Sequence, residues 1–141
     1  MKIRQEKCLV LESGAFIGSR LTMELLQTGY HVRILERPNL SKAGLPFGYP
    51  PVEWFEGDFL NREELEAAVE GCSIIFHLIC TTLPKSSNEN PIYDVESNVI
   101  GSIQLLEIAR SHNVQKVVFL PSGGTVYGNS LGLCIVVFHL T

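Results

Sequence analysis

Short apolar runs recur along the chain at the length of buried β-strands, and polar or glycine-containing segments separate them. The five runs are Cys8–Leu11, Val32–Leu35, Val52–Phe55, Ser73–Leu78 and Lys116–Leu120. The fourth run is almost wholly apolar, as expected of a strand that is buried on both faces of a parallel sheet. The pattern therefore predicts five short strands.

Apolar residues recur at helical spacing in segments between these runs. The first such set ends before Gly29, a residue that suits the end of a helix, and consists of Ile17, Leu21, Leu25 and Leu26. Asn61 and Glu64 have the spacing of a capping box and predict a helix through Val69. A third, long helix carries its apolar residues on one side, at Val95, Val99, Ile103, Leu106 and Ala109.

Strands that alternate with helices indicate an α/β fold, a doubly wound parallel sheet of the Rossmann-like kind. Right-handed crossover connections favour the strand order 3-2-1-4-5. Two loops, residues 38–51 and 80–91, separate predicted elements, and the sequence contains no internal repeat and no low-complexity tract.

The segment 129–141 departs from this alternation. It is too apolar for a surface tail and too short to span a membrane. Two interpretations stand: a sixth strand that covers the exposed edge of the fifth, or an unrelated ending on an interrupted chain. We therefore divide the chain into a main domain, residues 1–128, and an atypical apolar tail, residues 129–141.

The composition indicates one ordinary soluble domain. The chain has 141 residues, of which 45% are hydrophobic and 18% are charged, and its formal net charge is -4. The hydrophobic share argues against disorder, and the charged share is too low for a coiled coil or a solvated acidic tail. Binding to nucleic acid needs clustered Lys and Arg, so we expect no nucleic-acid partner.

The cysteines predict neither a metal site nor disulfides. Cys8, Cys72, Cys80 and Cys134 form no Cys-x-x-Cys pair and have no short spacing to a histidine, whereas a zinc site needs several converging N or S ligands. The N-terminus shows no secretory signal, and no apolar run reaches about 18 residues. We expect a cytoplasmic, reduced protein with no membrane partner.

The turn between the first strand and the first helix is a candidate anion site. In a doubly wound sheet this turn offers backbone N–H groups and a helix N-terminus to a pyrophosphate. Gly18 permits close packing of helix on strand, and Ser13, Gly14 and Ala15 are small enough for a phosphate to approach. Taken alone, the turn is equally well an ordinary strand-to-helix connection.

Glu36 supplies the second half of a dinucleotide-binding pattern. It ends the second predicted strand, at about the 20-residue distance from the turn at which a carboxylate accepts the ribose hydroxyls of an adenosine. A 2′-phosphate would be repelled there, which favours NAD over NADP, although the neighbouring Arg37 weakens that preference. An acid at a strand end is otherwise a solvated surface group, but the order strand, turn, helix, strand and acid predicts dinucleotide binding.

Five short motifs follow predicted strand ends or lie in the long helix. They are Phe16-Ile17-Gly18-Ser19, Glu56-Gly57-Asp58-Phe59, Phe76-His77-Leu78, Asn98-Val99-Ile100-Gly101 and Thr125-Val126-Tyr127-Gly128. Together they resemble the NAD-dependent epimerase/dehydratase family, the extended short-chain dehydrogenases that include UDP-glucose 4-epimerase. The resemblance runs from Lys7 to Gly128 and covers only the N-terminal part of a family member.

The resemblance implies an NAD site and assigns residues to it. The pyrophosphate would be lined by Gly14, Phe16, Ile17 and Gly18, and the adenosine ribose would be held by Glu36. The adenine would be flanked by Asp58 and Phe59. The cofactor would be followed toward its nicotinamide half by Leu78, Ile79 and Cys80. Asn98 would support the active-site end of the long helix. His77 is expected to be a packed strand residue and not a ligand, and no metal is implied.

The turn departs from the family pattern Thr-Gly-Gly-x-Gly-Phe-Ile-Gly. Glu12, Ser13 and Ala15 stand where its earlier glycines belong. Glu12 puts a side chain where a glycine makes the tight turn, and its carboxylate would repel a pyrophosphate by an energy on the order of 1 kcal/mol. We therefore expect weakened affinity for NAD.

The family's catalytic pair is absent from the sequence. In the family a tyrosinate takes the proton of a sugar hydroxyl while a hydride passes to NAD, and a lysine four residues on lowers the tyrosine pKa. The fourth residues after the four tyrosines are Ile34, Glu53, Ser97 and Leu131. The family's catalytic tyrosine also has a Ser or Thr partner, whose position, counted back from Thr125-Val126-Tyr127-Gly128, is occupied here by Gly123. Ser122 and Thr125 are the nearest hydroxyl residues and are imperfect candidates for this catalytic role.

The leading interpretation is the N-terminal, cofactor-binding part of an NAD-dependent nucleotide-sugar epimerase/dehydratase, inactive alone. Binding of a nucleotide sugar is expected only of a full-length parent. The alternative is a non-catalytic dinucleotide-binding or interaction module that uses a sheet edge or the apolar tail. A degenerate or prematurely terminated product is the third interpretation, and association into a homo-oligomer stays open.

Overall fold

Five parallel strands form the centre of the computed structural model, which describes residues 5–14, 16–38, 52–79, 88–120 and 136–139. The strands are β1 Lys7–Leu11, β2 His31–Glu36, β3 Glu53–Glu56, β4 Ile74–His77 and β5 Lys116–Phe119. Their order in the sheet is β3-β2-β1-β4-β5. The predicted α/β fold with strand order 3-2-1-4-5 is confirmed.

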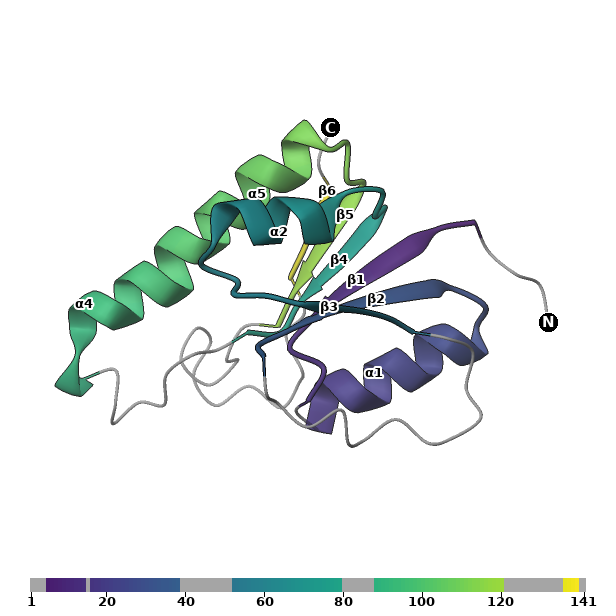
Figure 1. Cartoon of the computed structure of the whole chain (residues 1–141), viewed down its shortest axis with the longest axis horizontal. Helices are drawn as coiled ribbons and strands as arrows, with labels where there is room; N and C mark the ends of the chain where they lie inside the picture. The colour runs from purple at the N-terminus through teal and green to yellow at the C-terminus, as the bar shows by residue number, and fades with distance from the viewer. Residues whose placement is uncertain (1–4, 15, 39–51, 80–87, 121–135, 140–141) are drawn as a thin grey trace.

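Helices cover both faces of this sheet (Figure 1). Helix α1, Phe16–Gln27, lies on one face, and helices α2, Arg62–Val69, and α5, Gly101–Ser111, lie on the other. Successive side chains of β1 alternate between the two faces: Cys8 and Val10 pack with α1, whereas Leu9 and Leu11 pack with α2 and α5. Because both faces of β1 are covered, this strand is apolar from Cys8 to Leu11.

A sixth strand, β6 Val136–His139, extends the sheet beyond β5. It pairs with β5 in the antiparallel direction, from Lys116 opposite His139 to Phe119 opposite Val136. The prediction of an added strand in the segment 129–141 is thus confirmed for Val136–His139. This strand covers the β5 edge, whose unpaired backbone groups would otherwise be open to association. The proposed domain boundary at residue 128 lies outside the described residues.

The start of α2 follows the predicted cap only in part. Asn61 is the N-cap, and its side-chain oxygen accepts hydrogen bonds from the backbone N–H groups of Glu63 and Glu64 at 3.1 and 3.3 Å. The reciprocal half of a capping box is missing, because the Glu64 carboxylate accepts instead from the Asp58 N–H at 2.7 Å. The Asn61 N–H donates to the Asp58 carbonyl, so it does not need Glu64.

The predicted long helix consists of three segments. The short helix α4, Pro91–Asp94, continues into a π-helical segment η1, Val95–Ile100, and then into α5. The hydrogen bond from the Gly101 N–H to the Glu96 carbonyl spans the five residues typical of a π turn.

The apolar face predicted for this helix is wrong in its first half. Val95, Val99 and Ile103 are each about half exposed, whereas Ser97 and Gly101 are buried. A π turn contains more residues than an α turn, so side chains before it are rotated relative to those after it. A Cβ on Gly101 would lie 2.6 Å from the Phe59 ring, which shows that small residues let the helix approach the core.

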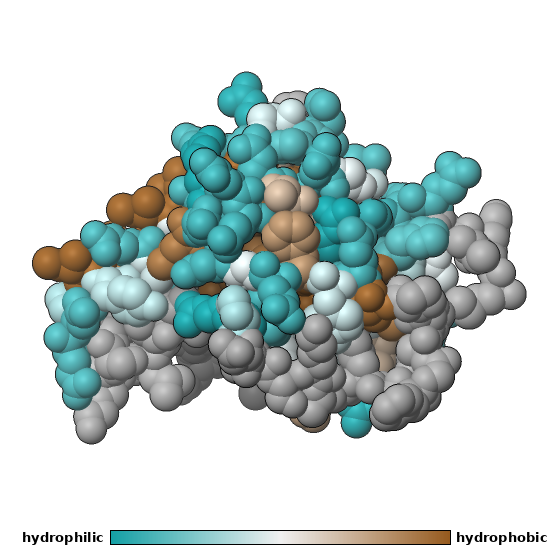
Figure 2. Space-filling view, in the orientation of Figure 1, coloured by the Kyte–Doolittle hydropathy of each residue, from teal (hydrophilic) through white to brown (hydrophobic). Residues whose placement is uncertain are grey.

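The rotation leaves a stripe of apolar side chains on the surface. Ile92, Val95, Val99 and Ile103 are all exposed, and Figure 2 shows apolar atoms gathered at the end of the molecule formed by α4 and η1. Association into a homo-oligomer through the long helix stays a prediction.

Two of the expected absences can be examined in the part of the chain that is described. There, no helix combines the length and the apolar character needed to cross a bilayer. Among the same residues, no three His, Cys, Asp or Glu side chains lie close enough together to hold a metal ion. Cys72 is a buried thiol that donates to the Ala68 carbonyl, and burial raises its pKa.

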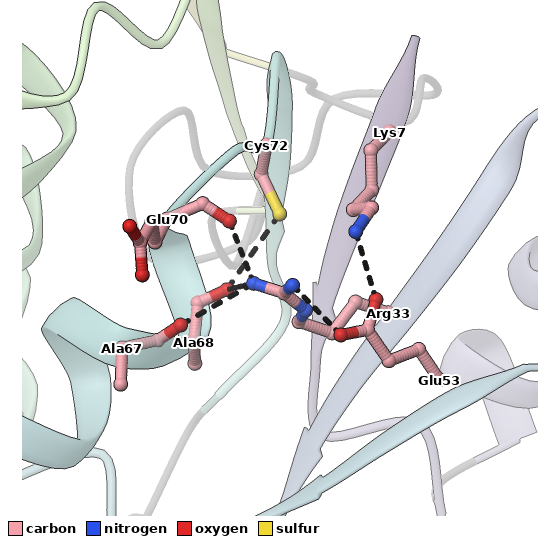
Figure 3. A network of polar contacts seen from close by, with 7 residues as sticks. All are labelled: Lys7, Arg33, Glu53, Ala67, Ala68, Glu70 and Cys72. Atoms are coloured by element: carbon pink, nitrogen blue, oxygen red, sulfur yellow. Dashed lines mark hydrogen bonds and ion pairs between the residues drawn. The ribbon is translucent and has the colours of Figure 1, made fainter. Parts of the chain in front are cut away.

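Arg33 closes the C-terminal end of α2 (Figure 3). Its side chain points from β2 to the last turn of the helix, where Nη1 donates to the carbonyls of Ala68 and Glu70 at 2.7 Å each and to that of Ala67 at 3.3 Å. The last carbonyls of a helix have no partner within the helix and carry partial negative charge. A buried guanidinium therefore satisfies several acceptors at once and ties the helix to the sheet.

The charge of Arg33 is balanced by Glu53 on the neighbouring strand β3. Arg33 Nη2 donates to one carboxylate oxygen of Glu53 at 2.7 Å, and the Lys7 ammonium lies 2.9 Å from the other. These hydrogen bonds, first that of Arg33 and then that of Lys7, lower the pKa of Glu53. The network joins β1, β2, β3 and α2.

We expect Arg33→Met to lower the free energy of unfolding by about 3 kcal/mol, because it leaves the buried Ala68 carbonyl, the partly buried Ala67 and Glu70 carbonyls and Glu53 without the guanidinium. The matched control is Arg62→Met, since Arg62 only forms an exposed 3.5 Å pair with Glu107. The control should change stability by less than about 0.5 kcal/mol. Urea unfolding measures both, and equal effects would contradict the role given to Arg33.

Candidate functional site: the carboxyl ends of the parallel strands

The carboxyl ends of the five parallel strands meet at one edge of the sheet. The register places Leu11 beside Leu35 and His77, and Glu36 beside Glu56. In doubly wound sheets ligands bind at this edge, where the strand order reverses between β1 and β4. Most of the predicted site residues that are described follow these strand ends.

Gly18 holds the start of α1 directly against the end of β1. A Cβ at Gly18 would lie 2.4 Å from the Glu12 carbonyl oxygen and 2.7 Å from Ser13 Cα. Both are backbone atoms that a flexible side chain cannot move aside, so only glycine fits. The helix N-terminus is therefore brought up to the turn, as the sequence predicts.

Glu12 has a backbone conformation that glycine adopts more readily than other residues. Its φ is 67°, in the left-handed region that L-residues other than Asn and Asp rarely adopt. Its N–H donates to the Leu35 carbonyl at 3.2 Å, which fixes the turn to β2. The turn retains a glycine-like path at the cost of about 1 kcal/mol or more of backbone strain.

Glu36 and the turn are in direct contact. The Glu36 Oε2 atom accepts a hydrogen bond from the Gly14 N–H at 3.0 Å, and the side chain is buried. A Cβ at Gly14 would lie 3.4 Å from the same oxygen, an ordinary van der Waals contact, so this position is close to Glu36 without excluding a side chain. Two residues that are far apart in the sequence are thus joined at the edge of the sheet.

The two residues that open α1 have exposed side chains. Phe16 is 79% exposed and Ile17 is 51% exposed, although both are large and apolar. They are the first residues of the helix, where backbone N–H groups have no partner within the helix. Their position suits a ligand that contacts the main chain of the helix N-terminus.

Asp58 and Phe59 follow β3 but have opposite surroundings. Asp58 is exposed, and its carboxylate accepts from the Leu60 N–H at 3.0 Å. Phe59 is only 3% exposed and packs against Gly101 and the His77 ring. Since its ring belongs to the core, any contact of Phe59 with a ligand would come from its main chain.

The remaining predicted residues are distributed around β4 and η1. Leu78 and Ile79, just after β4, are half-buried and pack toward opposite faces of the sheet. Asn98 lies in η1, and its side-chain amide donates to the Asp94 carboxylate at 2.8 Å. Cys80, Ser122 and Thr125 lie outside the described residues.

His77, the last residue of β4, is packed as predicted. It is 3% exposed, and its ring lies between those of Phe59 and Phe119, with centroid distances of 5.2 and 5.1 Å. Burial lowers the pKa of His77 to about 4. Its Nε2 atom lies 2.8 Å from Ser102 Oγ. The sequence interpretation missed this partner, for which the only signal was a hydroxyl residue directly after Gly101.

Comparison with protein families gives one match over most of the chain. Residues 10–134 match the model of the NAD dependent epimerase/dehydratase family. A relative described as a putative UDP-glucose 4-epimerase from Methanocaldococcus jannaschii is 32% identical over 85% of this chain and 39% of its own length. The mouse sterol-4-alpha-carboxylate 3-dehydrogenase, decarboxylating, is 30% identical over 88% of this chain and 32% of its own length.

A solved structure shares the fold. The UDP-glucose 4-epimerase of Thermus thermophilus in complex with NAD is similar with a TM-score of 0.68 and 29% identity, over 79% of this chain and 36% of that one. The chain therefore spans well under half the length of each of these relatives.

The neutral state of His77 predicts a pH dependence of stability. Its pKa is about 4 in the folded chain against an ordinary 6.5, so only the unfolded chain takes up this proton as the pH falls from 6.5 to 4. The contribution of neutral His77 to the free energy of unfolding is therefore complete above pH 6.5. About 3 kcal/mol of this free energy is lost as the pH falls from 6.5 to 4.

Urea unfolding at several pH values between 4 and 7 measures this loss. His77→Phe keeps an aromatic ring and removes the titrating group, so its stability should depend less on pH than that of the wild type. Identical pH slopes for the two proteins would contradict a neutral, buried His77.

Proposed function

Because the chain belongs to the NAD dependent epimerase/dehydratase family, we propose that it binds NAD at the carboxyl edge of its parallel sheet. The turn between β1 and α1 receives the pyrophosphate on backbone N–H groups and the helix N-terminus. Gly18 makes this approach of the helix sterically feasible. When bound, NAD supplies a hydride acceptor at its nicotinamide ring.

The contact between Glu36 and Gly14 is the observation that carries the proposal. A carboxylate held at 3.0 Å from a backbone N–H of the turn stands beside the proposed pyrophosphate position. This is the arrangement in which an acidic residue accepts the ribose hydroxyls of an adenosine. The same negative charge disfavours the 2′-phosphate of NADP.

The other predicted residues extend this site in both directions. The exposed Asp58 carboxylate lies on the adenine side, after β3, together with the main chain of Phe59. Leu78 and Ile79 lie on the nicotinamide side, after β4, and Asn98 supports that side from η1. Phe16 and Ile17 contribute main-chain N–H groups at the pyrophosphate.

Two of the relatives support a cofactor role for the matched region. One is named for a UDP-sugar and the other for a sterol, yet both align with more than four fifths of this chain. A region common to proteins named for such different molecules fits binding of a shared cofactor better than binding of either substrate. We assign recognition of a substrate, such as a nucleotide sugar, to a longer parent protein.

The chain by itself is proposed to hold the cofactor without converting a sugar. Its sequence contains no Tyr-x-x-x-Lys pair, and without such a pair no tyrosinate is available to take the proton of a sugar hydroxyl. The absence of this pair is also consistent with the alternative role, a non-catalytic dinucleotide-binding module. Turnover of UDP-glucose by the purified chain would contradict the proposal.

Calorimetric titration of the 141-residue chain tests the proposed function. NAD should bind with a single site per chain and about tenfold more tightly than NADP, because Glu36 repels the 2′-phosphate. Glu36→Gln should weaken the binding of NAD and reduce the preference for NAD over NADP. Glu107→Gln, which changes an exposed carboxylate on α5, is the matched control. Absence of NAD binding, or equal binding of both nucleotides, would count against the site.

Substitutions at Glu12 separate its charge from its backbone conformation. Glu12→Gln removes the charge and keeps the left-handed residue, so NAD affinity should rise about fivefold with little change in stability. Glu12→Gly should raise affinity similarly and also increase the free energy of unfolding by about 1 kcal/mol, because it relieves the positive φ. Wild-type affinity in both variants would show that Glu12 does not weaken the site.

A further inference from the structure

A partly buried chain of hydrogen bonds connects the end of β4 to the π-helical segment. His77 Nε2 lies 2.8 Å from Ser102 Oγ, and Ser102 Oγ donates to the carbonyl of Asn98. The first contact joins the sheet to α5, and the second reaches back four residues into η1. A predicted cofactor residue, Asn98, is therefore linked to His77 through one serine hydroxyl.

The direction of these bonds fixes the tautomer of His77. A serine hydroxyl has one proton, and the Asn98 carbonyl can only accept. Since Ser102 gives its proton to Asn98, the hydroxyl must accept from His77, so Nε2 carries the imidazole proton. Nδ1 then holds a lone pair, and among the described residues it is buried without a hydrogen-bond partner. A proton added at Nδ1 would have no acceptor, in agreement with the low basicity of this ring.

Hydroxyl groups stabilise both ends of the π-helical segment. Ser97 Oγ donates to the Tyr93 carbonyl at 2.7 Å at the α4 end, and Ser102 Oγ donates to the Asn98 carbonyl at the α5 end. Such side-chain bonds to the carbonyl four residues earlier compete with the regular helix ladder and bend helices. At the α5 end, the hydroxyl is oriented from outside the helix, by His77.

We propose that His77 is a positioning residue that, through Ser102, holds η1 in its π-helical register and thereby sets the place of Asn98 at the carboxyl edge of the sheet. The inference rests on the proposed function only for its last step, the effect on NAD. The register itself depends on the hydrogen-bond chain and on the packing of His77 between Phe59 and Phe119.

The close packing around Gly101 limits the positions that the start of α5 can take. Gly101 fits against Phe59 only without a Cβ, and the residue after it is Ser102. At the Asn98 carbonyl, the Ser102 hydroxyl competes with the regular α-helical donor, the Ser102 N–H, and loss of the hydroxyl would favour the α-helical bond. An α-helical register rotates the preceding residues around the helix axis and moves Asn98 away from its present position.

The first test is a measurement on the wild-type chain. Long-range ¹H–¹⁵N NMR spectra at pH 7 distinguish a protonated from an unprotonated imidazole nitrogen. The expected result for His77 is a protonated Nε2 and an unprotonated Nδ1. The opposite tautomer would overturn the proposal, because Ser102 would then donate to His77 and not to Asn98. This test needs neither a variant nor NAD.

The second test uses substitutions of the serine. Ser102→Ala should change the backbone amide shifts of residues 95–100 and weaken NAD binding about fivefold. Ser102→Thr keeps the hydroxyl, so the amide shifts of residues 95–100 and the NAD affinity should stay close to those of the wild type. Ser111→Ala is the matched control, because Ser111 Oγ also donates to a carbonyl of α5, that of Ile108 at 2.8 Å, but lies at the far end of the helix.

The outcomes separate this inference from the proposed function. Unchanged shifts of residues 95–100 in Ser102→Ala would overturn the register lock whether or not NAD binds. Shifted amides with unchanged NAD affinity would overturn the link to the cofactor and leave the site itself intact. If the wild type does not bind NAD at all, the proposed function fails, and the tautomer and the amide shifts still decide the register.

Discussion

The contact of α1 with the end of β1 at Gly18 is the constraint on which the site depends. Only a residue without Cβ lets the helix begin against the backbone of Glu12 and Ser13. This approach aims the helix N-terminus at the turn and leaves Gly14 within reach of Glu36 on the next strand. Without it, the N–H groups of the turn and the carboxylate that stands beside them would not meet at one edge of the sheet.

Two polar residues buried within this fold hold helices in place. Arg33 satisfies the end of α2 and is balanced by Glu53. Neutral His77 directs one serine hydroxyl toward the π-helical segment. Both residues come from strands of the sheet and act on helices of the same face, so the helices that flank the site are fixed by specific bonds as well as by apolar packing. Glu12, in contrast, introduces strain and charge into the turn.

The strand pattern was sufficient to predict the sheet, because buried parallel strands are short continuous apolar runs such as Cys8–Leu11. The positions of Gly18 at the start of the first helix and of Glu36 at the end of the second strand followed from the order of elements, whereas the positive φ of Glu12 was not predicted. The π turn was not predicted either, since it depends on tertiary contacts of Gly101 and Ser102 that no local propensity encodes. For the same reason Val95 and Val99 were placed on the wrong face, and the burial of the Phe59 ring in the core was not predicted.

The central claim is that NAD occupies the carboxyl edge of the sheet, and mapping its position by NMR tests this claim most directly. A ¹⁵N-labelled chain would be titrated with NAD and the backbone amide shifts followed. The account predicts saturable changes at Gly14, Gly18, Glu36 and Asp58, and none at the end of α2 that Arg33 closes. Saturable changes confined to the opposite edge of the sheet or to the exposed stripe of the long helix would contradict it.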